Sequence, residues 1–148
     1  MDDKNSTLIC LDLEGTLISN AVSQIPRSHL FHFLTEIHKL ARLVLFTSVS
    51  PKRTIDIQHL LVHEGKVPDW FGELEALHPA QTVKPMSQAV EYAPLAKRYL
   101  LVDDQPRCIE DEHRAWWIKV SEFIPPYEND DELLHVLCTL RHECQRGD

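Results

Sequence analysis

Four short apolar runs, each followed by polar residues, recur along the chain. The first runs from Leu8 to Asp12, and the others lie at 43–48, 98–104 and 116–120. A continuous apolar run of this length is typical of a strand that is buried on both faces of a parallel sheet. We therefore predict four strands of a parallel sheet at these positions.

Segments in which apolar residues recur at helical spacing separate the predicted strands. Cap residues, prolines and glycines mark their expected ends. In chain order, we predict a helix capped by Ser28 and reaching Leu40, one from Ser50-Pro51 to Gly65, one from Lys84-Pro85 to near Pro94, one from about Pro106 to His113, and a last one capped by Asp130 or Asp131. The segment 66–82 is expected to be irregular.

This alternation of strands and helices predicts an α/β fold. The expected architecture is a three-layer sandwich in which a mostly parallel, Rossmann-like sheet has helices on both faces. A length of 148 residues suits one domain and allows a sizeable buried core. We predict a single domain over residues 1–148, without repeats or linkers.

Charge and cysteine content narrow the possible functions. The net charge of −8 argues against a broad nucleic-acid-binding face, which is usually basic. The N-terminus lacks the pattern of a signal peptide, and no apolar run is long enough to span a bilayer. The four cysteines form no Cys-x-x-Cys pair, so we expect reduced thiols in a cytoplasmic protein.

Polar groups suited to phosphate chemistry stand at the ends of three predicted strands. Asp12 is followed closely by Glu14, Thr47 ends the second strand, and Asp103-Asp104 end the third. Parallel strands place their carboxyl ends along one edge, where a crevice opens, so we expect these groups to converge. Acids at such an edge repel each other and lose water, a cost tolerated mainly where a cation or a reaction uses them. The alternative is a strand followed by a solvated acidic turn.

The order of four short motifs resembles the haloacid dehalogenase (HAD) superfamily. These motifs are Asp-Leu-Glu-Gly-Thr-Leu at 12–17, Leu-Phe-Thr at 45–47, Lys84-Pro85, and Val-Asp-Asp at 102–104. Further stretches, at 46–48, 102–107 and 124–127, resemble the small phosphatases of the NLI-interacting-factor and polymerase-tail group. The gaps between the motifs hold only a helix and loops, so we expect no separate cap domain.

The resemblance implies a role for each matching residue. Asp12 would be the nucleophile that forms an aspartyl-phosphate, and Glu14 would act as general acid and base. Thr47 and Lys84 would hold the phosphoryl group, and Lys84 would keep Asp12 ionised. Ser48 and Gly15 are further expected substrate contacts.

The resemblance also implies a Mg²⁺ site formed by Asp12, Glu14 through its carbonyl, Asp103 and Asp104. A hard cation prefers such oxygen ligands and offsets the charge of a phosphoryl group. Two residues depart from the family pattern. Glu14 replaces the usual aspartate and is one methylene longer, and Gly15 replaces an acidic residue of the polymerase-tail group.

We therefore predict a Mg²⁺-dependent phosphomonoester hydrolase. An open cleft would admit a phosphopeptide, a phosphoprotein or a small phosphometabolite, while the sequence leaves the oligomeric state open. A non-catalytic phosphate- or protein-binding module on the same fold is the alternative. A phosphorelay receiver domain ranks third, because its acid pair lies on the first strand whereas Asp103-Asp104 come last.

Overall fold

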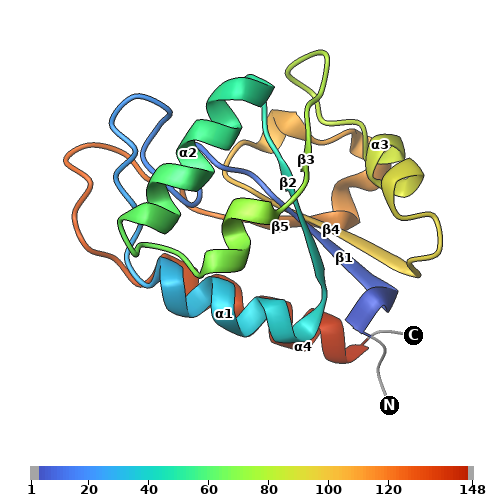
Figure 1. The fold of residues 1–148 in the computed structure, drawn as a ribbon. Helices are drawn as coiled ribbons and strands as arrows, with labels where there is room; N and C mark the ends of the chain where they lie inside the picture. The colour runs from blue at the N-terminus through green and yellow to red at the C-terminus, as the bar shows by residue number, and fades with distance from the viewer. Residues whose placement is uncertain (1–3, 147–148) are drawn as a thin grey trace.

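A computed structural model describes residues 4–146 and contains a five-stranded parallel sheet (Figure 1). The strand order is β3-β2-β1-β4-β5. The strands are β1 (Thr7–Leu11), β2 (Arg42–Phe46), β3 (Ala76–Leu77), β4 (Arg98–Asp103) and β5 (Trp117–Lys119). The α-helices are α1 (Leu30–Leu40), α2 (Pro51–His63), α3 (Met86–Tyr92) and α4 (Glu132–Arg146), and the 3-10 helices are η1 (Lys4–Ser6), η2 (Asp69–Glu73), η3 (Pro106–Cys108) and η4 (Asp111–Trp116).

The predicted α/β architecture is confirmed, with differences in detail. The very short strand β3 lies within the segment 66–82, which was expected to be irregular. The helix expected near 106–113 is replaced by the two 3-10 helices η3 and η4. Ser28 does not cap α1, whose N-cap residue is His29; the Ser28 hydroxyl instead contacts Asn129 and the backbone of Asp130.

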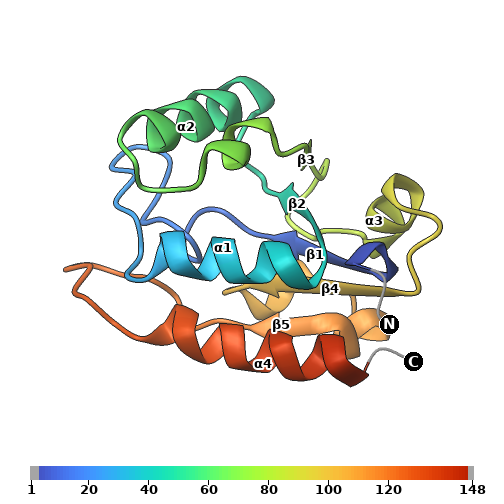
Figure 2. The ribbon, with the colours of Figure 1, turned by 60° about the horizontal axis from the view of Figure 1, so that its bottom comes forward.

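Alternate residues of the central strands face two separate cores. Ile9 and Leu11 point to the core formed with α1, α2 and α4, whereas Leu8 and Cys10 point to the core formed with α3. This alternation follows from the two-residue period of a strand, and apolar side chains on both faces require helices on both. The views agree that α1 and α4 lie side by side (Figures 1 and 2).

The register of β1 with its neighbours brings the polar strand ends together. Leu11 pairs with Leu45 of β2 on one side and with Val102 of β4 on the other. The residues that follow these positions therefore emerge at one edge of the sheet, with Asp12 between the ends of β2 and β4. Among the described residues, no helix is both long and apolar enough to cross a membrane.

Candidate active site

Asp12 directly follows β1 and is almost completely buried at the bottom of a cleft. Its backbone N–H donates to the carbonyl of Val102 at 3.0 Å, which continues the pairing with β4. Its side-chain Oδ1 accepts from Lys84 Nζ at 2.8 Å, and Oδ2 accepts from the Thr16 hydroxyl at 2.9 Å. The carboxyl group is therefore oriented by one charged and one neutral donor.

Lys84 lies in the connection between β3 and α3 and links two carboxylates. Its buried ammonium group donates to both Asp12 and Asp103. Its backbone N–H donates to the carbonyl of Cys108 at 2.6 Å, which holds the connection against η3. Burial favours the neutral amine, but the negative charges of Asp12 and Asp103 outweigh it and raise the pKa of Lys84, so the side chain is a cation at neutral pH.

Asp104 follows β4 and packs against the turn that contains Gly15. One of its oxygens accepts from the Thr16 hydroxyl at 3.0 Å and the other from Gln105 Nε2 at 2.8 Å. Gly15 has a φ of +76°, and a Cβ atom there would lie 2.7 Å from Asp104 Oδ2. Both the conformation and the space therefore require glycine at this position.

Three carboxylates in this site face a single ammonium group. Oxygens of Asp12, Asp103 and Asp104 lie within 4.8 Å of one another. The one hydroxyl hydrogen of Thr16 can serve only one of the two carboxylates that it contacts. Burial raises the pKa of Asp12 well above its ordinary value despite the opposing effect of Lys84, and the neighbouring acids raise it further.

This excess of buried negative charge fits a divalent cation. The available ligand atoms are all carboxylate oxygens, which a hard cation such as Mg²⁺ prefers. A bound cation would relieve the repulsion that Lys84 alone leaves uncompensated. Asp12, Asp103 and Asp104 are therefore the side chains that could hold Mg²⁺.

Glu14 lines the cleft, but its side chain is bound to the following loop. Its Oε2 accepts the backbone N–H of Ala21 at 2.6 Å. Its other oxygen makes no hydrogen bond with any of the residues that the structure describes. The longer side chain is thus tethered through one oxygen while the second stays available for proton exchange.

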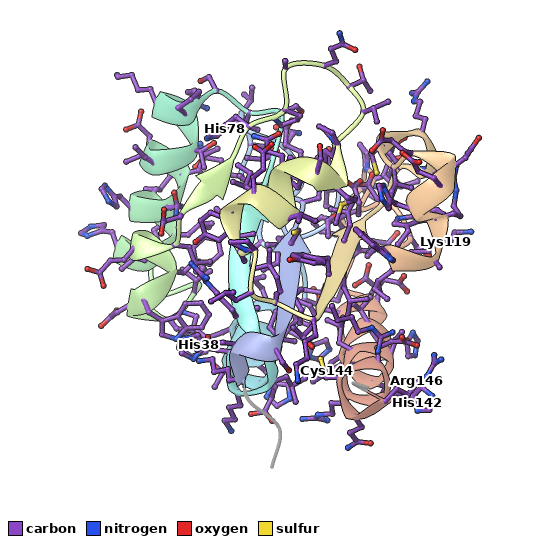
Figure 3. The ribbon with its side chains drawn as sticks, turned by 90° about the vertical axis from the view of Figure 1, so that its right-hand side faces the viewer. His38, His78, Lys119, His142, Cys144 and Arg146 are labelled. Carbon is purple, nitrogen blue, oxygen red and sulfur yellow. The ribbon has the colours of Figure 1, made fainter. Side chains whose placement is uncertain are left out.

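Thr47 and Ser48 follow β2 and differ in exposure. The Thr47 hydroxyl is buried and accepts the backbone N–H of Val49 at 3.1 Å, whereas Ser48 is exposed and lines the cleft. His78 Nδ1 contacts the carbonyls of Thr47 and Val49 at 3.2 and 2.9 Å. Figure 3 shows His78 at the end of the sheet where the strands finish, opposite the end where Cys144 lies. His78 therefore supports the turn after β2.

The structure brings the predicted residues together around one cleft of about 700 Å³. Every predicted site residue lines it except Thr47, which is buried. The lining residues predicted from the sequence are Asp12, Glu14, Gly15, Ser48, Lys84, Asp103 and Asp104. Its other walls include the loop 79–82, Gln105 and Arg107.

Arg27 supports the site from below and was not identified from the sequence. It is buried, and its Nη1 donates to the carbonyls of Gly15 and Thr16 at 3.4 and 3.3 Å. Its Nη2 pairs with Asp130 at 3.0 Å, and its guanidinium group lies 5.1 Å from the centre of the Phe123 ring. This role follows only from contacts with residues far away in the sequence, because the sequence around Arg27 has no distinguishing pattern.

Cys108 also lines the cleft, but its environment argues against a role as nucleophile. Its Sγ donates to the carbonyl of Gln105 at 2.7 Å. Burial, followed by the negative charge of Asp103, raises the pKa of the thiol. Because the thiolate is the reactive form, this cysteine stays unreactive at neutral pH.

The family model described as NLI interacting factor-like phosphatase matches residues 7–148, which is nearly the entire chain. No curated protein matches the chain. The matched region contains every residue of the cleft.

Proposed function

The chain belongs to the NLI interacting factor-like phosphatases, which are HAD-type phosphoric monoester hydrolases, and we propose that it acts through an aspartyl-phosphate on Asp12. The observation that carries this proposal is the arrangement of Asp12 with Lys84, Asp103 and Asp104 at the bottom of an open cleft. A carboxylate held beside an ammonium group is the kind of nucleophile that this chemistry requires.

The first step transfers the phosphoryl group to the protein. An ionised oxygen of Asp12 attacks phosphorus in line, and the new O–P bond replaces the bond to the ester oxygen. The departing oxygen takes the proton of Glu14. Lys84 favours the ionised form of Asp12 against the effect of burial. The Thr47 turn with Ser48 helps to bind the phosphoryl oxygens, together with the backbone at Gly15.

The second step releases phosphate. Glu14, now a carboxylate, takes a proton from a water molecule whose oxygen attacks the phosphorus of the aspartyl-phosphate. The bond to Asp12 breaks, which restores its carboxylate and the protonated Glu14. Mg²⁺ held by Asp12, Asp103, Asp104 and the Glu14 carbonyl would supply positive charge opposite the phosphoryl oxygens.

The decisive experiment measures hydrolysis of an aryl phosphate with Mg²⁺ and with EDTA. We expect turnover with Mg²⁺ only, and its loss in Asp12→Asn. Asp56→Asn, at an exposed position of α2, is the matched control and should retain full activity. Glu14→Gln should lower kcat by about 10²- to 10⁴-fold. An active Asp12→Asn protein would contradict the proposal.

The substrate is a phosphopeptide, a phosphoprotein or a small phosphometabolite, which the open cleft can admit. A panel of phosphopeptides, sugar phosphates and nucleotides would separate these classes by kcat/KM. We expect nucleic-acid phosphates to be poor substrates, because the chain is strongly acidic overall.

The tether between Glu14 and Ala21 favours a second candidate, a non-catalytic phosphate- or protein-binding module. If Glu14 Oε1 does not reach the leaving oxygen while Oε2 is held by Ala21, the protein could bind phosphorylated ligands without turnover. Mg²⁺ binding without hydrolysis of any substrate in the panel would support this candidate over the first.

A further inference from the structure

Both polar backbone groups of Ala21 are bound by side chains from different parts of the chain. Its N–H donates to Glu14 Oε2 at 2.6 Å. Its carbonyl accepts from Gln24 Nε2 at 3.0 Å and from the guanidinium group of Arg53, a residue of the first turn of α2. Glu14 and α2 are thus connected through a single residue of the loop between them.

The loop around Ala21 is braced by its own side chains. Asn20 Oδ1 accepts the N–H groups of Val22 and Ser23 at 2.9 and 2.7 Å, and the Ser19 hydroxyl accepts that of Ile25 at 2.8 Å. These bonds make the loop a compact turn. The Arg53 guanidinium group joins this turn to α2, so the turn and the helix together fix the position of the Ala21 N–H.

The contact with Ala21 restricts the additional conformations that the extra methylene gives to the Glu14 side chain. A glutamate has one more rotatable bond than the aspartate usual at this position, and therefore more orientations in which its carboxyl group misses the leaving oxygen. Binding Oε2 to a held N–H removes this freedom and leaves Oε1 for the proton. An acid contributes to catalysis only within hydrogen-bond reach of the leaving group.

We propose that Arg53 is a positioning residue, which acts through Ala21 to orient the Glu14 carboxyl group for proton transfer to the leaving oxygen. This inference rests on the proposed function of Glu14. A different role for an exposed arginine near a phosphate site is direct contact with the substrate. The two roles predict different dependence on the leaving group.

The test compares 4-nitrophenyl phosphate with phenyl phosphate. Nitrophenolate leaves readily without a proton, whereas phenolate is more basic and depends more on the acid. We expect Arg53→Ala to lower kcat/KM about 10-fold for phenyl phosphate and less than about 3-fold for nitrophenyl phosphate. Arg53→Lys should recover part of the loss. Lys52→Ala, which removes the neighbouring exposed charge, should change neither value.

A double-mutant cycle then shows whether Arg53 acts through Glu14. In a Glu14→Gln background, Arg53→Ala should cause no further loss, because the acid is already absent. An equal loss for both substrates, or a loss that persists in the Glu14→Gln background, would overturn the proposal. If Arg53→Ala does not fold, Gln24→Asn, which weakens the second side-chain contact to the Ala21 carbonyl, tests the same connection to Glu14 with the two substrates.

The two proposals can fail separately. If the wild-type protein hydrolyses neither substrate, the proposed function fails and this inference fails with it. If the wild-type protein is active and Asp12→Asn is inactive, the proposed function stands. The positioning role alone is then overturned if Arg53→Ala depends on the leaving group in the same way as the wild-type protein.

Discussion

Replacing Gly15 with alanine tests whether the close approach of this turn to Asp104 is needed for the site. Gly15 has a φ of +76°, where an alanine costs about 1–2 kcal/mol. For a chain of this size, we expect the melting temperature to fall by about 2–8 °C. This part of the effect is purely conformational and should appear at any glycine with a similar φ.

The second part of the effect belongs to the site. The added Cβ would lie 2.7 Å from Asp104 Oδ2, while ordinary contact begins at 3.4 Å, so the carboxylate must move by roughly 0.7 Å. A displacement near 1 Å at reacting groups can cost about 10²-fold in rate. We therefore expect Gly15→Ala to lower kcat/KM by about 10- to 100-fold and to weaken Mg²⁺ binding.

Gly65 provides a matched control within the same chain. It has a φ of +71°, but no atom lies within 4 Å of the position that its Cβ would take. Gly65→Ala should therefore lower the melting temperature by a similar amount and leave activity unchanged. Thermal unfolding, Mg²⁺ titration and aryl phosphate hydrolysis measure the three quantities. Equal activity in the two variants would refute the argument for Asp104.

Three further predictions concern charge and hydrogen bonding around the site. Burial raises the pKa of Asp12, so in EDTA its contribution to stability is present at low pH and is lost as the pH rises from the ordinary aspartate value through the raised one. The melting temperature of the wild-type protein should therefore fall relative to Asp12→Asn as the pH rises above about 4, and parallel curves would contradict this. Arg27→Ala should lower the free energy of unfolding by about 1–3 kcal/mol in urea, because it leaves Asp130 and the carbonyls of Gly15 and Thr16 without their donor. Loss of the surface pair in Arg141→Ala should cost less than about 1 kcal/mol. Thr16→Val should destabilise the protein by about 1–2 kcal/mol and reduce turnover, whereas Thr16→Ser, which keeps the hydroxyl, should retain turnover.

The central strands could be predicted because their side chains must be apolar on both faces of the sheet. Residues of β1 and β2 face cores on both sides of the sheet, so nearly every position must be apolar. β3 could not be predicted in the same way, since it has only two residues and both are half-buried. Its pairing depends on β2 rather than on its own sequence.

Whether a predicted N-cap residue caps its helix depends on the other partners that its side chain can reach. Ser50 caps α2 as expected, and its hydroxyl accepts from the Arg53 N–H at 3.4 Å. Ser28 has the same chemistry but lies beside the segment before α4, and its hydroxyl contacts Asn129 instead. Asp131, one of two expected caps of α4, contributes its carbonyl there while its side chain contacts His29.

The groups at the strand ends could be anticipated because parallel strands finish together. The supporting contacts could not, since they join residues far apart in sequence. Lys84 bonds to the backbone of Cys108, and Arg53 reaches Ala21 across the loop. No periodicity or motif encodes such pairs, which arise only after the elements have packed.

The loop between β3 and α3 is held at both ends by contacts that do not involve its middle. His78 is bound to the carbonyls after β2, and Lys84 is bound to η3. Residues 80–83 between them are exposed, and 80–82 line the cleft. The middle of this loop can therefore be exchanged as a unit, because its length and side chains can change without displacing Lys84. Substrate preference could be altered there by evolution or by loop grafting while the chemical machinery is retained.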